Sequence, residues 1–134
     1  MTIDAPGDST RHRTVLLVDD EKMVLDVGKA ILQRLGHEVI TAESGEEALD
    51  QFDRHRDRIG CVVLDLTMPG MDCSATFERL REMAPQLPVI IASGMSAEQV
   101  SGQFVSQPRT TVIQKPYQVA DLSAKIQSFV QDDD

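Results

Sequence analysis

Four apolar runs in this sequence each lead into residues that could take part in phosphate chemistry. Asp19 and Asp20 follow TVLLV, Asp65 follows GCVVL, Ser93 closes PVIIAS, and Lys115 follows TTVIQ. Three carboxylates held together repel one another, and a divalent cation resolves the conflict; a site of oxygen ligands alone selects Mg²⁺ or Mn²⁺. A lysine and a hydroxyl beside that metal would neutralise a phosphoryl group while a carboxylate attacks it in line. The set predicts phosphoryl transfer.

Taken singly, each of these residues has an ordinary structural explanation. Asp20 could cap a helix, and Ser93 could belong to a turn. A chance scatter of polar residues would not, however, place a polar group at the end of four apolar runs out of five. We therefore treat these residues as one candidate site.

The elements that would position this site alternate five times along the chain. Apolar runs predict strands at about 14–19, 38–42, 60–65, 88–93 and 110–114. Helical spacing predicts helices at about 22–35, 44–55, 72–84, 96–104 and 119–129. The first helix is expected from its apolar spacing, which comprises Met23, Val24, Val27, Ala30, Ile31 and Leu35. The sequences SGEE and SAEQ are capping boxes that begin the second and fourth helices.

Five strand–helix units with short connections predict an α/β fold with one doubly wound, five-stranded parallel sheet. Helices would cover both faces of this sheet, with right-handed crossovers. In such sheets a binding site lies beyond the carboxyl ends of the strands. The polar residues that follow the apolar runs would meet at that edge.

Length and composition indicate a single domain that contains its own core. The chain has 134 residues, of which 41% are hydrophobic and 26% are charged. We expect a flexible leader or linker at 1–13, the domain at 14–131 and an acidic tail at 132–134. The net charge of −9 argues against direct nucleic-acid binding. No apolar run approaches the roughly 20 residues of a membrane span, so we expect a cytoplasmic protein without membrane insertion.

The quoted runs also carry a family resemblance. VLLVDDE, VVLDLTMPGMD, VIIASG and IQKPY, in this order, resemble the CheY-like receiver domain of two-component response regulators, over about Thr14 to Val130. The resemblance implies a flavodoxin-like fold with strand order 2-1-3-4-5. It also implies that Asp65 accepts a phosphoryl group from the phosphohistidine of a histidine kinase. In this family Mg²⁺ would be bound by Asp19, Asp20, Asp65 and the backbone carbonyl of Thr67.

The resemblance further implies that Ser93 and Lys115 bind phosphoryl oxygens and that the Lys115–Pro116 peptide bond is cis. Two positions depart from the family pattern. Val112 stands where most receivers have a switching Phe or Tyr, and Tyr117 is not its equivalent. Cys73 stands where Gly is common. Because Val112 has no ring to rotate, we expect the helix at 96–104, which has few apolar anchors and contains a glycine, to carry the response.

Two other functions compete with this one. A haloacid-dehalogenase-type phosphatase also uses an aspartate after a strand, but its DxDx[TV] motif needs a second Asp, and Asp65 is followed by Leu-Thr. A receiver-like interaction module that works without phosphate would not need the complete acceptor set. We therefore expect a protein that catalyses only its own phosphorylation and dephosphorylation. Its expected partner is a sensor histidine kinase in cis or in trans, with a histidine phosphotransfer protein as a further candidate.

The sequence does not decide whether this domain stands alone or forms part of a longer protein. The chain is either a single-domain response regulator or a receiver that belongs to a longer protein. ASGMS together with KPY is similar to receivers at the C-termini of hybrid sensor histidine kinases. In that case the parent protein would itself be a kinase.

Overall fold

The computed structural model describes residues 14–66, 73–94 and 109–133, with side chains described up to residue 128. Five parallel strands form one sheet in the order β2-β1-β3-β4-β5. They are β1 (Thr14–Val18), β2 (Glu38–Ala42), β3 (Ile59–Asp65), β4 (Val89–Ser93) and β5 (Thr110–Gln114). The described helices are α2 (Lys22–Arg34), α3 (Gly45–Arg54), α4 (Cys73–Met83) and α6 (Val119–Asp133). The predicted doubly wound α/β sheet and its strand order are confirmed.

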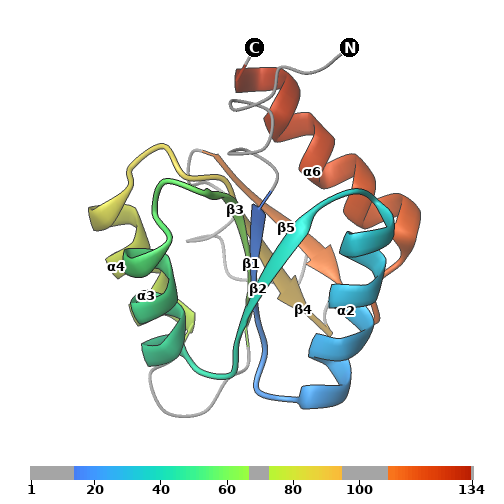
Figure 1. Cartoon of the computed structure of the whole chain (residues 1–134), viewed down its shortest axis with the longest axis horizontal. Helices are drawn as coiled ribbons and strands as arrows, with labels where there is room; N and C mark the ends of the chain where they lie inside the picture. Colours follow the sequence, from blue (N-terminus) through green and yellow to red (C-terminus); the bar gives the residue numbers. More distant parts are fainter. Residues whose placement is uncertain (1–13, 67–72, 95–108, 134) are drawn as a thin grey trace.

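The helices cover the two faces of the sheet in pairs, with α3 and α4 on one face and α2 and α6 on the other (Figure 1). Each pair closes its own hydrophobic core. Leu16, Val62 and Ile91 point to the α3–α4 side, whereas Leu17, Val63 and Ile90 point to the α2–α6 side. This alternation explains why the central strands read as continuous apolar runs, because both of their faces are buried. Cys61 and Cys73 are buried free cysteines within these cores.

Helix α2 forms where its apolar spacing predicts it, but it buries a different set of side chains. Its buried residues are Leu25, Gly28 and Leu32, whereas Met23 is 81% exposed and Val27 is 54% exposed. Gly28 sets this orientation, because a Cβ there would lie 2.8 Å from Leu17 Cδ2. The helix approaches the sheet at its glycine. Met23 and Val27 therefore lie on the outer face of the helix, although they belong to the apolar spacing that predicts it.

Replacing Gly28 should therefore destabilise the fold. A valine side chain would overlap both Leu17 and the Tyr117 ring, whose Cε2 lies 3.1 Å from the Cβ position. We expect Gly28→Val to lower the free energy of unfolding by about 2 kcal/mol, measured by urea denaturation. The matched control is Lys29→Val on the exposed side of the same helix, which should change it by less than about 0.5 kcal/mol. Equal losses in the two variants would show that helix propensity, and not crowding, is responsible.

The ends of two helices refine the sequence-based boundaries. Ser44 caps α3, since its Oγ accepts a hydrogen bond from Glu47 N at 3.1 Å. Glu47 Oε1 in turn accepts from Glu43 N at 2.7 Å, so the predicted capping box forms with its second bond one residue earlier than expected. Helix α6 continues to Asp133 and so includes most of the residues expected as an acidic tail. The helix expected at 96–104, the leader at 1–13 and Thr67 lie outside the described residues.

Candidate functional site

The candidate site lies at the edge of the sheet where its parallel strands end, the edge toward which the β4 and β5 arrows point in Figure 1. Register places the ends of neighbouring strands together. Val18 pairs with Leu64, immediately before Asp19 and Asp65. Asp65 pairs with Ala92 and Ser93 pairs with Gln114, so Asp65, Ser93 and Lys115 follow in order across β3, β4 and β5. The sheet alone brings the predicted site residues to one edge.

Three carboxylates form a compact cluster at this edge. Asp19, Asp20 and Asp65 each offer an oxygen, and these oxygens all lie within 4.8 Å of one another. Asp19 and Asp65 are fully buried, whereas Asp20 is exposed, so the cluster faces solvent on the Asp20 side. The local backbone holds the Asp19 side chain in place, because its Oδ1 accepts a hydrogen bond from Glu21 N at 2.9 Å. The arrangement could hold a divalent cation between oxygen ligands.

Lys115 joins the two buried carboxylates. Its Nζ donates to Asp65 Oδ1 at 3.0 Å and to Asp19 Oδ2 at 3.1 Å, and its side chain is only 16% exposed. The lysine backbone is fixed as well, since Lys115 N donates to the carbonyl oxygen of Ser93 at 2.6 Å. The peptide bond between Lys115 and Pro116 is cis, as the resemblance implies. An ammonium is thus held beside the carboxylate expected to be the phosphoacceptor.

The electrostatics of the site leave it short of positive charge. Burial raises the pKa of Asp19 above its ordinary value, and the neighbouring Asp65 raises it further, although the hydrogen bonds from Glu21 N and Lys115 oppose the shift. Burial would lower the pKa of Lys115, but its hydrogen bonds and charge interactions with Asp65 and Asp19 outweigh burial, and the pKa is raised. Within the described part of the chain, one ammonium, that of Lys115, faces the three carboxylates. A bound cation would relieve the remaining repulsion.

The other predicted residues are placed as follows. Ser93 is buried at the end of β4, in the strand beside Asp65. Val112 is 7% exposed and belongs to the core under α3 and α4, so an aliphatic core residue occupies the position of the switching ring. Tyr117, to which the sequence assigned no role, packs on the opposite face against Gly28. Burial chiefly raises the pKa of Tyr117, and the charges of Asp19 and Asp65 raise it further.

Comparison with known proteins identifies the family to which this chain belongs. The model of the response regulator receiver domain matches residues 15–127. The chain belongs to this family. Among solved structures, a response regulator receiver domain protein from Clostridium thermocellum superposes with a TM-score of 0.83 at 27% identity, covering 90% of this chain and 95% of that one. The CheX–CheY–BeF₃–Mg²⁺ complex from Borrelia burgdorferi gives a TM-score of 0.79 at 31% identity, covering 86% and 87%.

Curated relatives place such a domain in two kinds of longer protein. The sensor kinase CckA of Brucella abortus is 28% identical over 132 residues, which are 98% of this chain and 14% of that protein. A probable transcriptional regulator, ycf27 of Cyanophora paradoxa, is 32% identical over 120 residues, which are 88% of this chain and 48% of that protein. The chain is thus a receiver domain of two-component signalling and spans half or less of these relatives. The family assignment decides against the phosphatase alternative.

Among the helices of the described residues, none is both long enough and apolar enough to cross a membrane.

Proposed function

We propose that Asp65 is the phosphoacceptor of this receiver and takes its phosphoryl group from the phosphohistidine of a sensor histidine kinase in the cytoplasm. The observation that carries the proposal is the position of Lys115 Nζ, 3.0 Å from the buried Asp65 carboxylate and beside the three-carboxylate cluster. The family resemblance assigns the acceptor role to Asp65 and a ligand role to Asp19. Both oxygens of Asp19 already accept hydrogen bonds, from Glu21 N and from Lys115, which suits a fixed ligand rather than a nucleophile.

The donor set fits Mg²⁺, because it consists of oxygens and because the charge of the cluster calls for a divalent cation. Asp19, Asp20 and Asp65 would hold the ion, with the backbone carbonyl of Thr67 as the further ligand that the family resemblance implies. When bound, Mg²⁺ would neutralise charge on the oxygens of the transferring phosphoryl group. An acidic pocket of this kind is common to the family, and the CheY complex from Borrelia burgdorferi contains the metal.

The protein's own groups carry out the rest of the transfer. A carboxylate oxygen of Asp65 attacks phosphorus in line; a P–O bond forms, the P–N bond breaks, and its electron pair returns to the imidazole of the donor. Lys115 exchanges its contact with Asp65 for a phosphoryl oxygen, and the Ser93 hydroxyl donates to another. Ser93 is buried and the Lys115 side chain is only 16% exposed, so both groups are held at the same edge and need little reorganisation. The domain would turn over no outside substrate, because its product is its own acyl phosphate.

The metal assignment can be tested with a small donor. Incubation with acetyl phosphate and Mg²⁺ should yield one acyl phosphate per chain, seen by intact mass, and excess chelator should suppress the uptake at least about tenfold, since three carboxylates would otherwise repel the incoming phosphoryl group. Adding Mg²⁺ back should restore the uptake. Equal uptake with and without chelator would disprove the metal site but not the acceptor.

An exposed apolar patch beside the site supports a protein donor. The patch comprises Met23 and Val27 on α2 and Val119 at the start of α6, and the last two line a hollow of about 540 Å³. Helices α2 and α6 cover the same face of the sheet (Figure 1). Helix α2 begins just after Asp20 and α6 begins soon after Lys115, so Met23 and Val119 lie in the first turns that follow site residues, and the hollow extends from Val27 to the end of α2. A protein that brings a phosphohistidine to Asp65 would cover it.

A charge placed in this patch should therefore slow phosphoryl transfer from a protein donor but not from a small-molecule donor. Val27→Asp should slow phosphoryl transfer from a labelled histidine kinase that serves the unsubstituted domain by roughly tenfold, because a carboxylate would be buried at the interface. Uptake from acetyl phosphate should not change. Gln33→Asp adds the same charge on another exposed side of α2 and should leave both rates unchanged. If Val27→Asp slowed both donors alike, the patch would be a structural feature of the domain and not a docking surface.

A further inference from the structure

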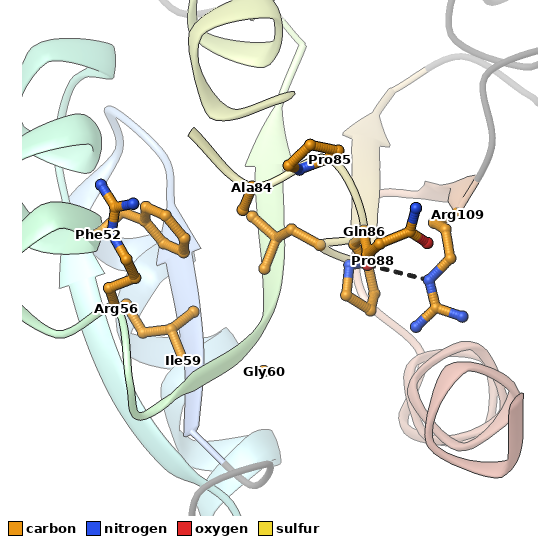
Figure 2. A pocket seen from close by; sticks show the side chains of 10 residues that line it. Phe52, Arg56, Ile59, Gly60, Ala84, Pro85, Gln86, Pro88 and Arg109 are labelled. Carbon is orange, nitrogen blue, oxygen red and sulfur yellow. Dashed lines mark hydrogen bonds between the residues drawn. The ribbon is translucent and has the colours of Figure 1, made fainter. Parts of the chain in front are cut away.

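A second hollow lies at the edge of the sheet opposite Asp65. It has a volume of about 500 Å³ and lies among the last turn of α3, the start of β3, the connection at 84–88 and the residue before β5. Its floor is apolar, with contributions from Phe52, Ile59 and Pro88. Figure 2 shows Phe52 and Arg56 on one side of it and Arg109 on the other, beyond Gln86 and Pro88. The hollow thus has an apolar centre between two guanidinium groups.

The charge of this hollow is opposite to that of the whole protein. The chain carries 22 acidic and 13 basic residues, yet the described residues that line the hollow include two arginines and no aspartate or glutamate. A third arginine, Arg81, lies behind the wall formed by the 84–88 connection. Its pKa is lowered, mainly by burial and also by the charge of Arg109. An anion in the hollow would relieve that repulsion between guanidinium groups.

The wall of the hollow is held in place from several directions. Arg81 Nη1 donates to the carbonyl oxygen of Leu87 at 2.6 Å, and its Nη2 donates to Thr110 Oγ1 at 2.9 Å, which ties the connection to β5. Arg109 Nε donates to the carbonyl oxygen of Gln86 at 3.0 Å. Arg109 has φ 56, a conformation that is uncommon outside glycine. It costs a residue with a side chain about 1 kcal/mol or more and persists only where surrounding contacts impose it. The hollow is therefore largely preformed.

Arg56 can change its partner at low cost. Its guanidinium lies 5.6 Å from the centre of the Phe52 ring. It donates from Nη2 to Asp53 Oδ1 at 3.1 Å and from Nη1 to the carbonyl oxygen of Met83 at 3.4 Å, so Nη2 can exchange its acceptor while Nη1 keeps its own. The two side chains of this ion pair are 47% and 68% exposed. Exposed pairs of this kind contribute little to stability. A carboxylate of a binding partner can therefore replace Asp53 as the acceptor for Arg56 with little loss of stability.

We propose that this hollow binds an acidic peptide segment of a partner protein. An apolar side chain of the segment would pack on Phe52, Ile59 and Pro88, and carboxylates on either side of it would pair with Arg56 and Arg109. A linear segment fits because the two guanidinium groups stand on opposite sides of the apolar floor (Figure 2). The proposal is independent of the phosphoacceptor assignment, since the hollow lies at the other edge of the sheet. The domain would then offer an interaction surface that leaves its phosphorylation edge uncovered.

A peptide titration followed by backbone amide NMR tests the proposal. The probe is an acetylated, amidated peptide in which a leucine is flanked by glutamates, and the control peptide has glutamines in their place. We expect shifts confined to residues 52–60, 84–89 and 109–110, and affinity for the glutamine peptide should be lower by roughly tenfold or more, because it cannot form charge-assisted hydrogen bonds. No shifts at millimolar peptide, or equal binding of both peptides, would overturn the proposal. Benzoate that moved the same amides at equal concentration would indicate a site for small carboxylates instead.

Three variants decide whether the two arginines act locally. Arg109→Gln and Arg56→Gln should each weaken binding of the glutamate peptide by roughly five- to tenfold. Arg54→Gln is the matched control, because Arg54 is the last residue of α3, two residues before Arg56, and pairs with Asp50 but does not line the hollow. It should bind like the parent. An equal loss in Arg54→Gln would show diffuse attraction and overturn the site. Arg56→Gln carries the test alone if Arg109→Gln disturbs the fold, which the NMR spectrum of the free variant would reveal.

Discussion

Asp65→Asn should abolish the base-labile acyl phosphate that acetyl phosphate forms on this domain, while the fold stays intact. An asparagine amide is not a nucleophile for phosphorus, and the expected loss is to below detection by intact mass. Asp50→Asn makes the same change at an exposed carboxylate of α3 that pairs with Arg54, and it should leave uptake unchanged. A phosphorylated Asp65→Asn protein would place the acceptor elsewhere.

The same substitution should raise stability when no divalent cation is present. Asp65 is one of three carboxylates whose oxygens lie within 4.8 Å of one another, and two of them are fully buried. Removing one charge relieves the repulsion, and asparagine Oδ1 can still accept the hydrogen bond from Lys115. We expect the free energy of unfolding to rise by roughly 1 kcal/mol, measured by urea denaturation in chelator. A clear fall would contradict the view that the cluster is short of positive charge.

The sequence predicts this site well because a parallel sheet requires little more information than strand order and strand ends. Each apolar run predicted a strand, and a charged or hydroxyl residue at its end could only lie at the common edge. Asp19, Asp65 and Lys115 meet there whatever course the connecting loops take. The positions of these three side chains follow from local sequence, and the fold brings together residues to which the resemblance assigns a role.

Features that depend on how elements pack were not predictable in this way. Helix α2 has apolar residues on two faces, and the face that lies on the sheet is the one where Gly28 fits closely against Leu17 beside the buried Leu25 and Leu32. The second hollow combines α3, a connection and the residue before β5, which are separated by many residues in sequence. Arg56 and Arg109 are ordinary surface charges when taken alone. Their common surroundings exist only in the folded chain.

Lys115→Met should produce the largest loss of stability among single substitutions in the site. The ammonium of Lys115 pairs with two carboxylates, those of Asp19 and Asp65, that are at most 1% exposed. Methionine has no positive charge and would leave both carboxylates without this partner. Breaking a buried charge pair costs about 3 kcal/mol or more, and the open Asp20 side of the cluster reduces this to about 2 kcal/mol. Lys29→Met removes the same charge from an exposed position on α2 and should cost less than about 0.5 kcal/mol. Urea denaturation in chelator at neutral pH measures both.

The pH and the metal should both modulate that loss. Asp19 has a pKa above its ordinary value of 3.8, so its protonated form is favoured by the folded state, and the stability this gives is present at low pH and lost as the pH rises through the raised pKa. Without Lys115 this pKa should rise further, so the deficit of Lys115→Met should be largest at neutral pH and shrink as the pH falls toward 3.8. Mg²⁺ at neutral pH should stabilise this variant more than the parent, because it supplies the missing positive charge at the same carboxylates. A deficit that neither acid nor Mg²⁺ reduces would mean that Lys115 stabilises the fold by packing alone.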